Sequence, residues 1–215
     1  GAKINGDKKY ATKFADIITH SYHPVKNITT GEGGAIFTNN QKLYKKILIL
    51  RNNGMIKQKD KYWEYRVNQL SMNFRVTDFQ CALGISQLKK LNMFIMKRNK
   101  IAKIYDDIFK NVENVTLPAT NKKIYHAYHL YPLLINFKKT RITKKRLFLE
   151  LRKKNINLQV HYVPLYYHGL FSKFTNKNLL PITEEFYNKE VSLPIYPDLK
   201  GTQVKKITKE ILNLI

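Results

Sequence analysis

The chain has 215 residues, 43% of them hydrophobic, enough for one large domain or one and a half ordinary domains with a buried core. No apolar run approaches the roughly 18 residues that a membrane span needs, and the first residues contain no apolar signal core, so we expect a soluble, cytoplasmic protein. Cys81 is the only cysteine, which excludes an internal disulfide framework and a cysteine-based zinc site.

The formal net charge is +24, which by itself suggests a protein that binds nucleic acid or a membrane surface. The lysines are spread along the whole chain, however, and do not form a single block. Lys, Asn, Ile and Tyr are frequent together, as in an AT-rich coding sequence. We therefore expect no nucleic acid and no membrane as partners, and keep a basic nucleic-acid-binding protein as an alternative. A basic surface would also favour an anionic small substrate.

Two predicted strands flank a lysine near the start of the chain. The β-branched and aromatic residues of 15–22 predict one strand, and 33–38 predicts a second. Between them, Lys26 is followed by three glycines within 31–34, where glycine permits positive φ and close backbone approach. Burial lowers the pKa of a lysine, and the free amine can then form a Schiff base with an aldehyde. A surface lysine in a plain glycine-rich hairpin is the alternative interpretation.

From residue 39 to residue 121 the apolar periodicity predicts helices separated by loops. Asn39 or Asn40 can cap the first helix, and Thr77 with Asp78 the next. The expected elements are a helix over 41–51 that ends at Asn52-Asn53-Gly54, a long loop over 55–69, a helix from 78 to about 88, a second helix from about 91 to 110, and a domain linker over 114–121. Cys81 lies on a helical face and is expected in the core.

After the linker, strands and helices alternate, which predicts a small α+β or α/β module. The expected elements are a strand over 127–137, a helix over 144–154 capped by Thr143, a short strand over 157–162, an aromatic loop over 165–181, a helix opening near 183, an extended piece over 193–197, and a last helix from 202. His126 and His129 are spaced like a metal pair, but no nearby Asp, Glu or Cys completes a ligand set, so we predict no metal site.

Four segments carry a more specific pattern. They are Ser21–Ala35, Arg51–Met55, Met72–Gly84 and Gln159–Pro164. In this order they resemble the DegT/DnrJ/EryC1/StrS family of sugar aminotransferases, which are pyridoxal-phosphate (PLP) enzymes. Two further segments, Gln87–Leu91 and Glu190–Pro194, are similar to the pseudaminic-acid branch of that family.

The resemblance implies an α/β fold class, namely the PLP-dependent transferase fold type I of aspartate aminotransferase. Residues 1–112 would form the C-terminal part of the PLP-binding large domain together with the interdomain helices. Residues 113–215 would form the small C-terminal domain.

The resemblance also implies a role for individual residues. Lys26 matches the lysine that forms the Schiff base with PLP, and it argues for amino transfer because family members with His at this position are dehydratases. Ser21 matches a serine that donates to the PLP phosphate. Asn73 matches an asparagine that reaches the phosphate in the neighbouring subunit, which implies a homodimer with shared active sites. His161 and Tyr162 match a segment lining the sugar-nucleotide site, although a buried, satisfied histidine is an equally good interpretation of His161.

The implied reaction moves an amino group from L-glutamate to the C4 ketone of a UDP-4-keto-6-deoxy-N-acetylhexosamine, for nonulosonic acid or surface-glycan biosynthesis in a bacterium. The family's aspartate for the PLP pyridinium and its phosphate-binding turn cannot be placed in this sequence. We therefore expect a C-terminal portion of the enzyme, inactive and poorly soluble on its own. A non-catalytic truncated or split subunit of the same family is an alternative.

Overall fold

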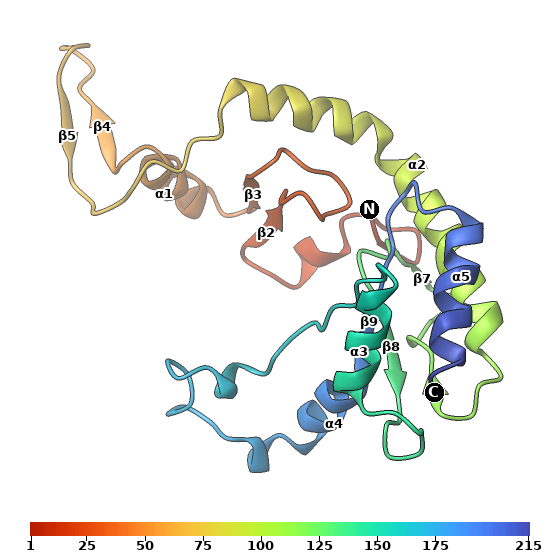
Figure 1. Ribbon diagram of the computed structural model, residues 1–215. Helices are drawn as coiled ribbons and strands as arrows, with labels where there is room; N and C mark the ends of the chain where they lie inside the picture. The colour runs from red at the N-terminus through yellow and green to blue at the C-terminus, as the bar shows by residue number, and fades with distance from the viewer. The chain divides into compact units, whose positions relative to one another are not determined.

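A computed structural model describes all residues 1–215, and their contacts group the chain into two compact units. Unit 1 comprises residues 1–92 with 123–125, and unit 2 comprises 93–122 with 126–215. The division falls within α2 (Asp78–Phe109), the longest helix of the chain (Figure 1). The domain boundary between residues 112 and 113, drawn for a complete enzyme, stays a prediction.

Unit 1 is built from three antiparallel strand pairs and short helical segments. The pairs are β1 (Lys3–Ile4) with β7 (Ile124–Tyr125), β2 (Ile18–Ser21) with β3 (Gly34–Phe37), and β4 (Met55–Lys57) with β5 (Tyr65–Val67). The helical segments before α2 are the 3-10 turn η1 (Tyr10–Lys13) and α1 (Gln41–Arg51). The predicted strand pair around Lys26 is therefore confirmed, with both strands shorter than expected.

Helix α1 begins and ends where the sequence predicts. The side chain of Asn40 accepts hydrogen bonds from the backbone N–H groups of Lys42 and Leu43, so it satisfies two of the free donors of the first turn. At the other end Asn53 adopts a φ of 57°, a left-handed conformation that asparagine tolerates and that stops a helix.

Three expectations for unit 1 are wrong. Residues 55–69 are not an irregular loop but contain the β4–β5 hairpin, whose ladder pairs Met55 with Val67. The two expected helices are one, α2, because residues 85–109 contain neither Gly nor Pro to interrupt it. Cys81 is exposed on this helix rather than packed in a core.

Unit 2 contains a three-stranded antiparallel sheet with the strand order β6-β8-β9. Its elements after α2 are β6 (Val115–Thr116), β8 (Tyr131–Ile135), α3 (Lys144–Lys153), η2 (Leu165–Tyr167), η3 (Lys177–Leu179), α4 (Pro181–Lys189), β9 (Glu190–Leu193) and α5 (Gly201–Leu212). The predicted cap is confirmed, since Thr143 Oγ1 accepts from the N–H of Arg146.

Two expectations for unit 2 need correction. Part of the expected linker over 114–121 belongs to the sheet, as β6. The expected strand over 157–162 forms only one bridge, from Gln159 to Ser192 of β9, because the chain turns away beyond it. The remaining predicted helices are present, beginning at Pro181 and Gly201.

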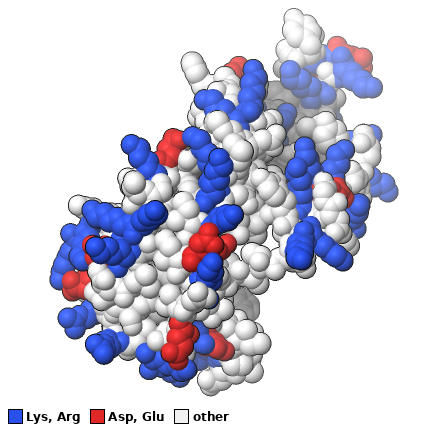
Figure 2. All heavy atoms as spheres, turned by 90° about the vertical axis from the view of Figure 1, so that its right-hand side faces the viewer, with Lys and Arg blue, Asp and Glu red and all other residues white.

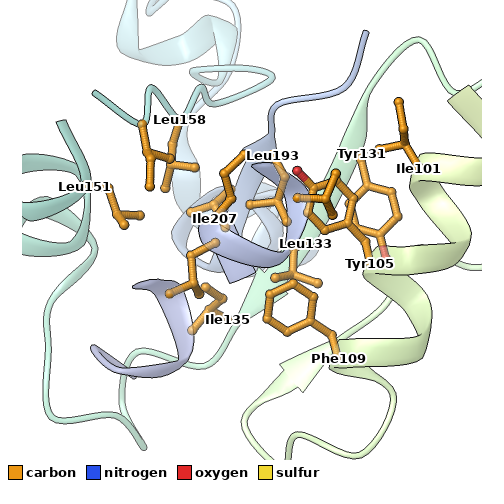
Figure 3. Close-up of a cluster of buried hydrophobic side chains, with 14 of the residues drawn as sticks. Ile101, Tyr105, Phe109, Tyr131, Leu133, Ile135, Leu151, Leu158, Leu193 and Ile207 are labelled. Carbon is orange, nitrogen blue, oxygen red and sulfur yellow. The ribbon is translucent and has the colours of Figure 1, made fainter. Parts of the chain in front are cut away.

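The core of unit 2 lies between its sheet and its helices (Figure 3). Tyr105 and Phe109 of α2 meet Tyr131 and Leu133 of β8, and all four side chains are at most 1% exposed. The Tyr131 hydroxyl donates to Asp106 Oδ1 at 2.5 Å, so the phenol is satisfied within the apolar cluster. Burial raises the pKa of Tyr131, and the hydrogen bond to Asp106 adds to this shift.

Unit 1, in contrast, buries almost nothing. Among residues 1–92 only Thr30 and Gly54 are buried, and large apolar side chains are exposed instead. The exposed fraction is 85% for Phe14, 100% for Leu70 and 91% for Phe79. Because monomeric proteins rarely expose large apolar patches without a function, these side chains mark a candidate interaction surface.

The charge of the chain is dispersed over its surface. Figure 2 shows Lys and Arg side chains distributed over the visible face, with the few acidic residues between them. The ion pairs include Lys97 with Asp198 and Lys13 with Asp7, both partly exposed to solvent, and such pairs contribute little to stability. None of the helices combines the length and the apolar character required to cross a bilayer.

The core of unit 2 can be tested through Leu133, which is fully buried at the centre of β8. Leu133→Ala should lower the free energy of opening of the β8–β9 hydrogen bonds by about 2–5 kcal/mol, because the truncation leaves a cavity. Hydrogen exchange of the β8 and β9 amides measures this quantity. Leu170→Ala, where the side chain is 74% exposed, is the control and should leave the exchange unchanged.

Candidate active site

The candidate site is a loop of unit 1 that connects β2 to β3 and carries Lys26. The ladder ends with Ser21 opposite Gly34, and the backbone N–H of Tyr22 then donates to Gly33 O at 2.9 Å. A second bond, from the N–H of Thr30 to Tyr22 O at 3.0 Å, closes the loop a little further on. The two bonds give the loop a narrow base, so that residues 23–29 form a compact projection.

Lys26 occupies the last position of a β-turn within this loop. Its backbone N–H donates to His23 O at 2.9 Å, and Pro24 stands at the second position of the turn, where a fixed φ near −65° is favourable. The side chain of Lys26 is half-buried, whereas Val25 beside it is 59% exposed. The turn therefore fixes the backbone of the lysine.

Two threonines hold the second half of the loop from inside. Thr29 Oγ1 donates to Tyr22 O at 2.9 Å and accepts from the N–H of Gly31, also at 2.9 Å. Thr30 is 7% exposed, and its hydroxyl donates to Glu32 O at 2.7 Å. Gly33 follows with a φ of 152°, and a Cβ there would lie 2.4 Å from Thr30 Oγ1. The glycine is thus required both by the backbone conformation and by the packing of Thr30.

The first turns of α2 dock onto the loop. Gln80 donates from its side-chain nitrogen to Glu32 O at 2.8 Å, across 48 residues of sequence. One turn later, the backbone of Gly84 passes so close to Thr30 that a Cβ would lie 2.8 Å from Thr30 Cγ2. Gly84 therefore allows the helix and the loop to touch, and the position of the loop depends on the position of α2.

The segment that precedes α2 is bound to the end of α1. The N–H of Phe74 donates to Arg51 O, and the N–H of Asn53 donates to Met72 O. Arg75 also donates from its guanidinium to the side chain of Asn52. Three of the four segments that resemble the family thus form one continuous assembly: the lysine loop, the end of α1 and the start of α2.

The structure places Ser21 and Asn73 in the same unit as Lys26. Ser21 is exposed at the end of β2, where its Oγ accepts weakly from the N–H of His23 at 3.4 Å. Asn73 is exposed in the segment paired with α1, and its Oδ1 accepts from the N–H of Arg75 at 3.1 Å. An amine on a fixed turn with a hydroxyl at the adjoining strand end is a donor set that fits PLP, which offers an aldehyde to the amine and a phosphate to the hydroxyl.

His161 and Tyr162 belong to unit 2 and are described separately. Tyr162 is 68% exposed, and its ring meets the half-buried ring of His161 edge-on, with centroids 4.7 Å apart. His161 is satisfied on one side, because its Nδ1 lies 2.7 Å from Ser192 Oγ. Ser192 in turn donates to the buried carboxylate of Glu190 at 2.6 Å. Burial lowers the pKa of nearby Lys144, and the charge of Glu190 partly opposes this shift.

Solved structures of sugar aminotransferases share this fold. The Helicobacter pylori aminotransferase PseC, described as involved in pseudaminic acid biosynthesis, superposes with a TM-score of 0.85 at 38% identity, over 93% of this chain and 53% of that one. The Streptococcus pneumoniae sugar aminotransferase Spr1654 in its PLP form gives a TM-score of 0.86 at 25% identity, over 98% of this chain and 54% of that one. The fold is therefore that of the PLP-dependent aminotransferases.

The chain belongs to the DegT/DnrJ/EryC1/StrS aminotransferase family, whose sequence profile matches residues 1–212. Among curated proteins, the UDP-4-amino-4,6-dideoxy-N-acetyl-beta-L-altrosamine transaminase of Helicobacter pylori is 40% identical over 93% of this chain and 52% of its own length. The chain thus spans about half the length of the curated relatives it matches. The family and the fold expected from the four segments are confirmed.

Several residues that build the site were not identified from the sequence. Thr30, Gln80 and Gly84 lie inside the matched segments, but their roles depend on a contact between the loop and α2 that the spacing does not reveal. The positions of Glu190 and Ser192, in contrast, could have been predicted from their spacing in the sequence. They are polar residues two apart in a buried strand, so they share one face of it, opposite to Val191 and Leu193.

The contact between α2 and the loop predicts an effect of Gly84→Ala in the full-length protein. Alanine raises helix propensity by about 1 kcal/mol, but the added Cβ would displace Thr30, and the overpacking should cost about 1–3 kcal/mol. We expect a lower thermal midpoint and weaker PLP binding, measured by calorimetry and by absorbance titration.

Thr30→Ser provides the matched test of this contact, because it removes Cγ2 and keeps the hydroxyl bound to Glu32 O. The double variant Thr30→Ser/Gly84→Ala should recover most of the midpoint and of the PLP affinity. Gly169→Ala, where a Cβ meets no atom within 4 Å, serves as the control. A double variant as impaired as Gly84→Ala alone would contradict the proposed contact.

Proposed function

We propose that this chain is the lysine-bearing part of a PLP-dependent sugar-nucleotide aminotransferase, with Lys26 as the catalytic residue. The observation that supports this most directly is the fixed position of Lys26 on a β-turn, in a loop closed at its base and held by α2. Aminotransferases of the family use PLP. PLP supplies an electron sink that stabilises the negative charge developing on the donor's Cα.

In this proposal Lys26 and Ser21 have different roles in the reaction. Lys26 Nζ would hold the cofactor through its aldehyde, and as a free amine it would take the proton that leaves the donor's Cα. Ser21 would donate its hydroxyl to the cofactor phosphate from the end of β2. The closed base of the loop and the Thr30–α2 contact keep both groups in register, which matters because small misplacements of a catalytic group are costly.

The acceptor substrate in this proposal is a UDP-4-keto-6-deoxy-N-acetylhexosamine, and the amino donor is L-glutamate. The name of the Helicobacter pylori relative, 40% identical to this chain, supports an amino sugar of this kind. The net charge of +24 favours an anionic sugar nucleotide. His161 and Tyr162 would contribute to binding the sugar nucleotide.

The active unit in this proposal is a homodimer with shared sites, in which Asn73 reaches the cofactor phosphate of the partner. The support is the exposure of unit 1, where apolar side chains around Asn73 such as Met72 and Phe74 are 65% and 57% exposed. Burial of apolar surface of this kind stabilises an assembly by about 25 cal/mol per Å² removed from water. Residues 1–215 alone would then not form a complete site and would not transfer amino groups.

The role of Lys26 is tested in the full-length protein with PLP and borohydride. Reduction should attach the cofactor covalently to Lys26, as identified by peptide mass spectrometry. Lys26→Ala should lose the visible absorbance band of bound PLP. It should also lower the rate of 2-oxoglutarate formation from glutamate and the 4-keto sugar nucleotide by at least about 10²–10⁴-fold, the range for general acid–base catalysis.

Lys46→Ala, an exposed lysine of α1, is the matched control and should keep both the band and the rate. Cofactor attached to another lysine, or a band that survives Lys26→Ala, would remove Lys26 from this role. An intact band without amino transfer would instead contradict the proposed substrates and leave the cofactor assignment standing.

A further inference from the structure

A chain of hydrogen bonds in unit 2 runs from the buried carboxylate of Glu190 through Ser192 to the ring of His161, and we call this chain the relay. Ser192 Oγ donates to Glu190 Oε1 at 2.6 Å, and His161 Nδ1 lies 2.7 Å from the same Oγ. Glu190 Oε2 accepts from the backbone N–H of His161 at 3.1 Å. Both oxygens of one carboxylate are thus committed to the support of a single histidine, one through its backbone and one through its side chain.

The supporting residues are fixed within the sheet. Glu190 is fully buried and Ser192 is 4% exposed, and both lie on the same face of β9. Residue 159 is paired with β9 by reciprocal bonds, Ser192 N–H to Gln159 O at 2.8 Å and Gln159 N–H to Ser192 O at 3.2 Å. The backbone that leads into His161 is therefore anchored to the strand that carries its two partners.

Hydrogen-bond chemistry indicates where the protons lie when Glu190 is a carboxylate. Both oxygens of Glu190 act as acceptors, so the Ser192 hydroxyl proton points toward Glu190. The Ser192 oxygen must then accept from His161, which places a proton on Nδ1. In the neutral ring this leaves Nε2 with a lone pair, as a hydrogen-bond acceptor.

We propose that Glu190 and Ser192 are positioning residues that hold His161 with Nε2 as an acceptor, and that Nε2 receives a sugar hydroxyl of the nucleotide-sugar substrate. The substrate part of this inference rests on the proposed function. A lone pair attracts a hydroxyl and repels a phosphate oxygen, so the relay selects the sugar rather than the diphosphate. The exposed ring of Tyr162 beside His161 offers an apolar surface next to this acceptor.

The substitution Glu190→Gln reverses this relay without changing its shape. The backbone N–H of His161 needs an acceptor, so the amide oxygen of the new side chain must face it, and the amide NH₂ must face Ser192. The NH₂ group donates to Ser192 Oγ, whose proton then turns toward His161 Nδ1. The ring proton moves to Nε2, and the acceptor offered to the substrate becomes a donor.

Nitrogen NMR of the full-length protein labelled on histidine tests the relay directly. The His161 signals are assigned by their loss in His161→Gln. The wild type should show the proton on Nδ1, and Glu190→Gln should show it on Nε2. Thr208→Ala, which removes another buried hydroxyl of unit 2, is the matched control and should leave the tautomer unchanged. The same tautomer in wild type and Glu190→Gln, or a doubly protonated ring in the wild type, would overturn the relay.

The substrate part is tested by calorimetry with two probes, UDP-N-acetylglucosamine and UDP. Glu190→Gln and Ser192→Ala should weaken binding of the nucleotide sugar by about tenfold, the effect of one hydrogen bond, and leave binding of UDP unchanged. An equal loss for both probes would overturn the assignment to a sugar hydroxyl. Failure of the wild type to bind either probe would contradict the proposed function, while the NMR result would still decide the relay.

Discussion

The contact between Thr30 and Gly84 is the constraint on which the lysine loop depends. Thr30 is one of only two buried residues among the first 92. Its side chain lies against Gly84 of α2 and against Gly33, and its backbone N–H donates to Tyr22 O at the base of the loop. A loop with so little buried surface would otherwise hold Lys26 poorly, because ordering each backbone residue costs about 1–2 kcal/mol. Loop position is therefore set by helix α2, and α2 begins at a segment bonded to the end of α1.

Local chemistry explains which elements could be predicted. The caps Asn40 and Thr143 make hydrogen bonds within three residues of sequence, and both helices begin where these residues stand. The β4–β5 hairpin was missed because residues 58–64 lack a short Asn-Gly or Asp-Gly turn and the strands have only three residues each. The helix end expected near residue 90 was wrong. An interruption of the apolar pattern does not end a helix when no Gly or Pro follows it, and α2 continues to Phe109.

The residues of the candidate site also separate into those that local sequence predicts and those that act through distant contacts. Lys26 and Ser21 were predicted as site residues because their segment resembles a family pattern. Gln80 and Gly84 instead act through contacts 48 and 54 residues away in sequence. No periodicity encodes such a contact. The polar pair Glu190 and Ser192 is intermediate: its spacing places both residues on one face of a strand, but only the three-dimensional structure reveals that this face carries His161.

The two units also differ in how many large apolar side chains they bury. Unit 2 has its own core, built around Tyr105, Leu133 and Leu193, and the relay to His161 lies in the same unit. Unit 1 carries Lys26 but lacks any buried large apolar side chain. Marginal stability leaves little margin for such exposure, since a domain retains only about 5–15 kcal/mol against unfolding. The exposed apolar side chains of unit 1 include Phe79 of α2, so burial of this surface would also stabilise the helix that contacts the loop of Lys26.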